Sequence, residues 1–207
     1  MRPVGARLPR TADPRTIGRT TMDEDLWVFG YGSLMWRPGF PFVEAAPARL
    51  KGRHRRLCVY SWVHRGTPEH PGLVLGLDRG GSCLGRAFRV AAEDREATIA
   101  YLREREQVTA VYLEKILRTR LEDGSGREID ALTYVVDRGH RQYAGLLPRE
   151  RLLEVVRDAT GQSGPNPEYI HATVAHLDEI GMRDDMLHWL SETLRAAGSA
   201  SAPAGGA

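Results

Sequence analysis

The stretch that decides the fold is Trp27-Val28-Phe29-Gly30-Tyr31-Gly32-Ser33-Leu34-Met35-Trp36. Its first three residues are bulky and favour a pleated, packed strand. Gly30 and Gly32 then allow a sharp turn, or a close approach of the backbone to a ligand, because neither carries a Cβ atom. A turn at a strand end exposes backbone N–H groups, which suits a negative or partly negative group. We therefore expect a strand followed by a loop that can bind an anion or an oxyanion.

The composition is that of an ordinary globular chain. It has 207 residues, 42% hydrophobic and 27% charged, which is enough for one domain with its own core. The formal net charge of +2 gives no overall attraction to nucleic acid or to a membrane. No apolar run approaches the roughly 20 residues of a membrane span. Cys58 and Cys83 fit neither a disulfide framework nor a zinc site, so we expect reduced thiols in a cytoplasmic protein.

The two ends of the chain differ in composition from the part between them. Residues 1–24 are rich in arginine and interrupted by prolines, which oppose an amphipathic targeting helix. Residues 196–207 are rich in Ala, Gly, Ser and Pro. We expect one domain over residues 25–195, between a disordered N-terminal extension at 1–24 and a disordered tail at 196–207.

Apolar alternation and turn residues place most of the strands before most of the helices. The expected strands are residues 26–31, 48–62, 72–77, 83–90, 112–121 and 128–136, with a turn at Gly80-Gly81. The expected helices are residues 92–107, 149–161, 169–181 and 184–194. Because strict strand–helix alternation is missing, the pattern predicts an α+β fold with a closed or strongly curved mixed sheet flanked by helices.

The glycine loop does not match the nucleotide-binding motifs. Met35 stands where a dinucleotide fingerprint needs a third glycine, and the Lys-Ser/Thr pair of a P-loop is missing. Ser33 adds a hydroxyl beside the backbone amides, and Leu34, Met35 and Trp36 would wall a site against water. A purely structural turn is the alternative for this loop.

Two acids lie close together near the end of the expected 92–107 helix, and helical phase separates them. Ile99, Leu102 and Glu106 share a face, whereas Glu104 lies roughly opposite Leu102. An apolar surrounding raises the pKa of a carboxyl group, and a carboxyl group nearer neutrality suits general acid–base catalysis. Glu106 is therefore the candidate base. A buried glutamate that only pairs with an arginine is the alternative.

Four other features give weaker evidence of a function. Residues 61–68 could bind a charged substrate end or could be only a connection between strands. His64 and His70 have no third ligand at a sensible spacing, so we expect no metal site. The basic run of residues 49–56 is expected to be the solvent edge of a strand rather than a nucleic-acid site. Tyr143, before a glycine turn, is by itself more typical of packing.

Taken together, these motifs resemble those of the ChaC-type gamma-glutamylcyclotransferases over about residues 26–194. The matching phrases are, in chain order, residues 29–36, 64–68, 72–77, 80–85, 101–102 with 105–106, 143–145 and 164–169. The family often has a Gly-rich continuation after the Arg-Glu pair. Here that continuation is Gln-Val-Thr-Ala-Val-Tyr, residues 107–112.

The resemblance implies a small mixed β-barrel flanked by helices, with a cavity at the glycine loop. It implies cleavage of glutathione to 5-oxoproline and cysteinylglycine without a cofactor or a metal, and with Glu106 as the catalytic residue. The substrate-binding residues would be Gly30, Tyr31, Gly32, Ser33, Leu34, Met35 and Tyr143.

Two other functions stay open at this point. One is a cyclotransferase for other gamma-glutamyl amino acids or amines, and the other is a non-catalytic regulatory protein of this fold. The expected partner is the small molecule glutathione, and neither nucleic acid nor a membrane is expected. No pattern in the sequence specifies an oligomeric state.

Overall fold

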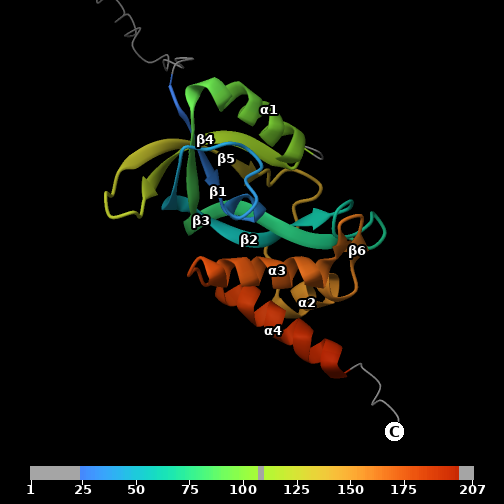
Figure 1. Cartoon of the computed structure of the whole chain (residues 1–207). Coiled ribbons are helices and arrows are strands. Elements are labelled where there is room, and N and C mark those ends of the chain that lie inside the picture. The colour runs from blue at the N-terminus through green and yellow to red at the C-terminus, as the bar shows by residue number, and fades with distance from the viewer. Residues whose placement is uncertain (1–23, 107–109, 201–207) are drawn as a thin grey trace, which may run out of the picture.

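The computed structural model describes residues 24–106 and 110–200, in which five strands close into a barrel (Figure 1). The order around the barrel is β1-β3-β2-β4-β5. Neighbouring strands are antiparallel, except that β1 pairs with β5 in parallel, so the sheet is mixed as predicted. The strands are β1 (Leu26–Gly30), β2 (Glu44–Ser61), β3 (Gly72–Val90), β4 (Tyr112–Leu121) and β5 (Glu128–Val136).

The helices lie on two sides of the barrel (Figure 1). One side carries α1 (Arg95–Glu106), which follows the short 3-10 helix η2 (Ala92–Asp94). The other side, beside β2 and β3, carries α2 (Arg149–Arg157), α3 (Asn166–Glu179) and α4 (Asp185–Ala200). A small sheet of β6 (Thr160–Gly161) and β7 (Gly164–Pro165) precedes α3. The predicted α+β barrel flanked by helices is therefore confirmed.

Two buried clusters hold these layers together. The larger one joins the barrel to the C-terminal helices, with Leu73 and Leu77 of β3 and Ile170 and Leu177 of α3 all fully buried. The second cluster, which includes Leu102, joins α1 to β1, β3 and β5. Burying such side chains stabilises the fold by about 1.5–3 kcal/mol each, before the entropy of ordering them is counted. α1, which ends at Glu106, is thus fixed to the barrel wall.

The predicted turn at Gly80-Gly81 is wrong, because β3 runs through this pair without a break. Gly80 and Gly81 have φ angles of 98° and 64°, and they lie opposite a bulge between Lys51 and Arg53 of β2. A bulge bends and twists a strand pair without ending it. The glycines that resemble a hairpin turn therefore mark a bend in two long strands.

Three predicted helix boundaries are also wrong. α2 ends at Arg157, and Gly161, expected as its terminating glycine, lies in β6. α3 begins at Asn166, ahead of Pro167, because proline is tolerated in the first turn of a helix. α4 continues past residue 195 into the expected tail. The rest of the expected tails, residues 1–23 and 201–207, lies outside the described residues.

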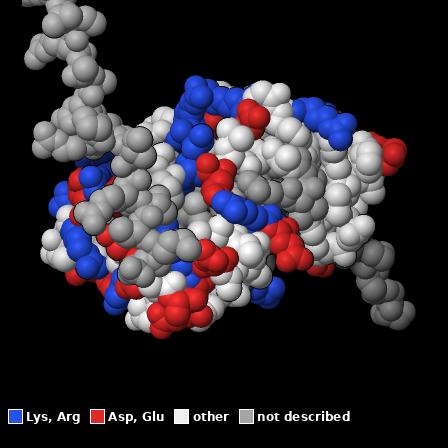
Figure 2. Space-filling model, turned by 90° about the horizontal axis from the view of Figure 1, so that it is seen from above, with Lys and Arg blue, Asp and Glu red and all other residues white. Residues whose placement is uncertain are grey.

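Charged side chains of both signs are interspersed on the face shown in Figure 2. Within the basic run of β2, Arg49 pairs with Glu122 at 3.0 Å, and Arg55 pairs with Asp184 at 3.8 Å. Arg56 lies 3.8 Å from the buried Asp78. Much of this run is therefore neutralised by acids of the same chain. Every helix in the described part of the chain is too short or too polar to cross a lipid bilayer.

Candidate functional site

A cavity of about 520 Å³ lies beside the loop that follows β1. Its volume is within the roughly 300–1,000 Å³ typical of small-molecule sites. The lining includes residues Tyr31 to Leu34 of the glycine loop, Glu106 at the end of α1, and tyrosines from β4, β5 and α3. The structure therefore brings the predicted loop and the predicted base to one cavity.

The loop forms a 3-10 turn, η1 (Ser33–Met35), directly after Gly32. The N–H group of Met35 donates to Gly32 O at 2.9 Å, and that of Arg37 donates to Ser33 O at 2.8 Å. The first N–H groups of such a turn have no acceptor inside it, and no side chain caps this one. Within the described part of the chain, the N–H groups of Ser33 and Leu34 have no acceptor, so each can donate a hydrogen bond to a substrate oxygen.

The two glycines of this loop have different roles. A Cβ atom on Gly30 would lie 3.0 Å from Leu34 Cβ, so the absence of a side chain lets the turn fold back onto β1. Gly32 has φ −132° and ψ −135°, outside the usual helix and strand regions, and a Cβ atom there would meet only Leu75 Cδ1 at 3.7 Å. Gly30 and the buried Met35 are not among the residues that line the cavity, so their predicted contact with substrate gains no support here. Gly32 does line the cavity.

Glu106 is the last residue of α1, and its side chain is 17% exposed. Burial raises the pKa of this carboxyl group above its usual value, and the nearby Arg105 only partly opposes the shift. The C-terminal end of a helix carries partial negative charge, which also disfavours a second negative charge there. The phase prediction is confirmed, because Leu102 is fully buried and Glu104 is exposed.

Arg105 ties α1 to the glycine loop. Its Nη2 atom donates to Ser33 Oγ at 2.8 Å, and its Nη1 atom donates to Arg37 O at 2.7 Å and to Tyr101 Oη at 2.9 Å. Its Nε atom lies 3.3 Å from Glu106 Oε1. The sequence reasoning gave this residue no role of its own, because a charge run at a helix end resembles a solvated face. Its position directly before Glu106 was the available signal.

Four tyrosines line the cavity, and only Tyr31 was predicted from the sequence; the others are Tyr112, Tyr134 and Tyr169. Tyr112 of β4 donates its hydroxyl to Leu75 O at 2.7 Å, and Tyr169 of α3 accepts from Leu75 N at 3.3 Å. Burial raises the pKa of Tyr31 and Tyr112 well above the usual value, and that of Tyr169 to about 12. These side chains are therefore neutral phenols that orient groups rather than accept protons.

Tyr143 lies outside the set of residues that line this cavity. Its hydroxyl donates to Asp78 Oδ2 at 2.9 Å, and Arg138 donates to Asp78 Oδ1 at 2.6 Å. Burial alone would raise the pKa of Asp78, but the bonds from Arg138, Arg79 N–H and Tyr143 outweigh burial and lower it. The structure thus gives Tyr143 a partner in the wall of the barrel, and the expected contact with substrate gains no support from its position.

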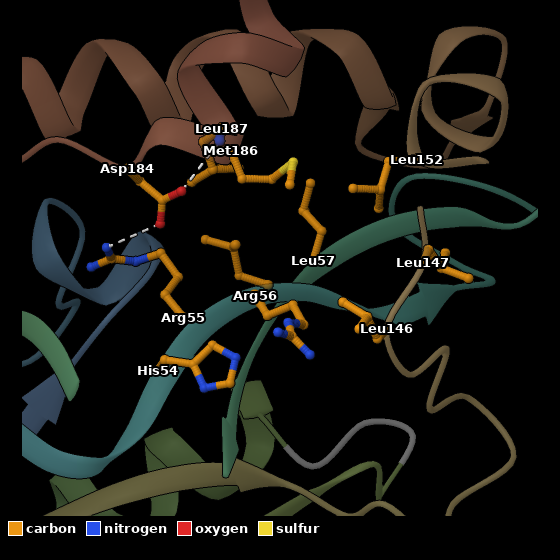
Figure 3. Close-up of a pocket in the computed structure, with 11 residues that line it drawn as sticks. His54, Arg55, Arg56, Leu57, Leu146, Leu147, Leu152, Asp184, Met186 and Leu187 are labelled. Carbon is orange, nitrogen blue, oxygen red and sulfur yellow. Dashed lines mark hydrogen bonds and ion pairs between the residues drawn. The ribbon is translucent and has the colours of Figure 1, made fainter. Parts of the chain in front are cut away.

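A second cavity, of about 200 Å³, lies between β2 and the helices α2 and α4 (Figure 3). Its lining is mostly apolar, with the Arg55–Asp184 pair at one edge. Arg55, 7% exposed, also donates to Tyr31 O and to Leu84 O, so it anchors the start of the glycine loop. Leu75 lines both cavities. The one carboxyl group in the lining of the second cavity, that of Asp184, is paired with Arg55, so this lining offers no free carboxylate to act as a base.

Comparisons with known proteins identify the family of the chain. A family model described as ChaC-like protein matches residues 26–197. The glutathione-specific gamma-glutamylcyclotransferase of Escherichia coli K12 is 34% identical over 163 residues, which cover 79% of this chain and 70% of that protein. The human glutathione-specific gamma-glutamylcyclotransferase 1 is 34% identical over 164 residues, which cover 78% and 72%.

A solved structure supports the same fold. The yeast gamma-glutamyl cyclotransferase specific to glutathione superposes with a TM-score of 0.73 at 22% identity, covering 84% of this chain and 99% of that one. The matched region contains the whole barrel, the glycine loop and Glu106. By its sequence and its fold, the chain belongs to the ChaC-like family of gamma-glutamylcyclotransferases.

Proposed function

We propose that this chain is a glutathione-specific gamma-glutamylcyclotransferase, which cleaves glutathione to 5-oxoproline and cysteinylglycine. The observation that carries the proposal is the position of Glu106, a mostly buried carboxyl group with a raised pKa. It lines the same cavity as Ser33 and Leu34, whose N–H groups have no acceptor among the described residues. Relatives at 34% identity that are named for this activity support the choice of substrate.

The reaction needs little besides a folded substrate. A gamma-glutamyl amide carries its own nucleophile, the α-amine, which closes a five-membered ring on the γ-carbonyl carbon. The amine and the carbonyl group already belong to one molecule, so a cavity that holds the chain in this bent form contributes by fixing the orientation of the attack. Tyr31, Leu75 and Tyr112 would restrict the substrate to that form.

Glu106 would move the protons. The substrate ammonium group gives a proton to the Glu106 carboxylate, and the freed amine forms a C–N bond to the γ-carbonyl carbon. The amide C–N bond then breaks, and the leaving nitrogen becomes the ammonium group of cysteinylglycine. Overall, two protons pass from the attacking nitrogen to the leaving nitrogen. A carboxyl group with a raised pKa suits both accepting and returning a proton.

The glycine loop would bind the oxygen that gains charge. The N–H groups of Ser33 and Leu34 are already held in position by η1, so they need no rearrangement when the tetrahedral intermediate forms. One such donor can stabilise a transition state by about 3 kcal/mol. Arg105 would keep this loop and Glu106 in a fixed relation.

The test is the release of 5-oxoproline from glutathione and from gamma-glutamyl-alanine by the purified protein. We expect 5-oxoproline from glutathione and much less from the dipeptide. Release from the dipeptide alone would identify a related cyclotransferase instead. A folded protein that releases 5-oxoproline from neither compound would favour a non-catalytic role.

We also propose a cytoplasmic location. Cys58 and Cys83 are buried and free, as expected of thiols in a reducing compartment. Burial raises the pKa of the Cys58 thiol to about 12, so it is protected from oxidation by its surroundings. Fluorescent tagging of the full chain in its native host would test this location.

A further inference from the structure

The connection between β2 and β3 is bound to the segment before α3 at the rim of the cavity. Ser163 N–H donates to His64 O at 2.9 Å, and His64 Nδ1 lies 3.0 Å from Ser163 Oγ. A Cβ atom on Gly161 would lie 2.5 Å from Gly66 N, so the two segments pack without a gap. His64 and Ser163 both line the cavity. This rim is therefore a built part of the site and not a loose connection.

Arg65 projects from this rim into the cavity lining. Its Nη1 atom donates to Pro165 O at 3.2 Å, and its guanidinium group stacks over the ring of Tyr169, 5.4 Å from the centroid. Within residues 24–106 and 110–200, Arg65 forms no ion pair with an acidic side chain. Glu168 is nearby, since a Cβ atom built on Gly164 would lie 3.5 Å from Arg65 Nη1 and 3.3 Å from Glu168 Oε2. An arginine has five N–H donors, so most of those on Arg65 stay available.

The other two arginines of the cavity are arranged differently. Arg105 is committed to Glu106, to Ser33 and to a backbone carbonyl group. Arg37 is exposed and has no aromatic ring or carbonyl group that braces its guanidinium group within the described residues. Arg65 is thus the one of the three that is both held in place and free to bind an anion.

Tyr169 links Arg65 to the reactive end of the cavity. Tyr169 lines the cavity together with Arg65 and Glu106. The Arg65 guanidinium group lies over its ring, 5.4 Å from the centroid. A substrate whose γ-glutamyl end is at Glu106 can extend past Tyr169 toward Arg65.

We propose that Arg65 binds the C-terminal carboxylate of the leaving peptide, which in glutathione is the glycine carboxylate. This inference rests on the proposed function. A guanidinium group can bind a carboxylate with two parallel hydrogen bonds, which is stronger and more directional than a single bond. The contact lies far from the reacting bond, so it contributes to substrate binding and to the choice of leaving group. It selects gamma-glutamyl peptides over gamma-glutamylamines.

The experiment compares glutathione with its C-terminal amide, which lacks the negative charge at the glycine end. For the wild-type protein we expect kcat/KM for glutathione to exceed that for the amide by about 10- to 100-fold, the effect of one hydrogen-bonded charge pair. In Arg65→Gln this ratio should fall close to one, with KM for glutathione raised and kcat nearly unchanged. Arg65→Lys should keep part of the preference, because it keeps the charge but not the planar fork.

Arg141→Gln is the matched control. Arg141 also stacks over an aromatic ring, that of Trp62 at 4.6 Å, but it is exposed and does not line the cavity. The Arg141→Gln variant should keep the full preference for glutathione over its C-terminal amide. A merely structural role of Arg65 would lower kcat/KM equally for both compounds and leave their ratio intact.

The outcomes separate the two proposals. A wild-type protein that cleaves glutathione and its amide equally well overturns the role of Arg65 and leaves the proposed function standing. The role of Arg65 is also overturned if Arg65→Gln keeps the preference for glutathione over its amide, or if Arg37→Gln abolishes that preference instead. The proposed function stands in both cases. A folded wild-type protein that cleaves neither compound overturns the proposed function, and the role of Arg65 falls with it.

Discussion

The Nη2 atom of Arg105 donates to the Oγ atom of Ser33 at 2.8 Å, which joins the end of α1 to the glycine loop after β1. The same guanidinium group lies beside the Glu106 carboxylate. A single side chain therefore sets the relation between the proposed oxyanion donors and the proposed base. These groups come from segments far apart in the sequence, so only the fold brings them together.

Arg105→Lys should lower kcat/KM for glutathione by about 100-fold, because a lysine cannot bind all of these partners and a shift of about 1 Å has that cost. The measurement is steady-state kinetics, with circular dichroism to show that the fold is kept. Arg103→Lys is the control, since Arg103 pairs with Glu114 on the exposed side of α1. Equal activity of the two variants would show that Arg105 does not position the glycine loop and Glu106.

The pH profile of kcat/KM should show the titration of Glu106. The base must be ionised in the free enzyme, so activity should rise with pH through the pKa of Glu106. Because burial raises that pKa, the acidic limb should lie above pH 4.5, the ordinary value for a glutamate. In Arg105→Gln the limb should move to still higher pH, because Arg105 lowers this pKa. A limb that stays in place in this variant would contradict the assignment.

Replacing Glu106 should stabilise the folded chain at neutral pH. A raised pKa in the folded state means that folding favours the protonated carboxyl group, so ionised Glu106 opposes folding above its unfolded pKa. This opposition disappears as the pH falls below that value. Glu106→Gln should therefore have a higher Tm than the wild type at pH 7, and the difference should vanish below about pH 4. A lower Tm at pH 7 would show that Glu106 is a stabilising structural acid.

The Tyr143→Phe variant tests the expected contact of Tyr143 with substrate. The structure uses this hydroxyl to bind the fully buried Asp78, so its loss should lower the free energy of unfolding by about 2 kcal/mol. We expect KM for glutathione to stay unchanged, because Tyr143 does not line the cavity. Urea denaturation and kinetics on the same preparation make this comparison. A raised KM with unchanged stability would restore the sequence-based expectation.

Local sequence patterns predict much of this fold. β1, β4 and β5 were expected within one residue of their observed bounds, because turn residues mark their ends: Gly30 closes β1, and Asp123-Gly124-Ser125-Gly126 separates β4 from β5. Helical phase alone also separated the buried Glu106 from the exposed Glu104. The resemblance to the gamma-glutamylcyclotransferases then predicted that these elements form a barrel with a cavity.

Long-range pairing accounts for what the sequence does not predict. Gly80 and Gly81 signal a turn locally, but the partner strand β2 keeps β3 in the barrel. Arg55 resembles one more cation of a basic strand, and only the position of Tyr31 O and Asp184 shows that it is a buried anchor. Tyr112 and Tyr169 carry no local signal, because their role depends on both reaching the same Leu75 peptide.

The most direct test of the central claim is 5-oxoproline release from glutathione by Glu106→Gln, with Glu104→Gln as the matched variant on the opposite face of α1. Removal of a general acid–base group should reduce kcat by about 100- to 10,000-fold, while the glutamine keeps the shape and polarity of the side chain. Glu104→Gln should be nearly silent, because Glu104 is exposed. Near-wild-type turnover by Glu106→Gln, or a severe loss in Glu104→Gln, would contradict the assignment of the base.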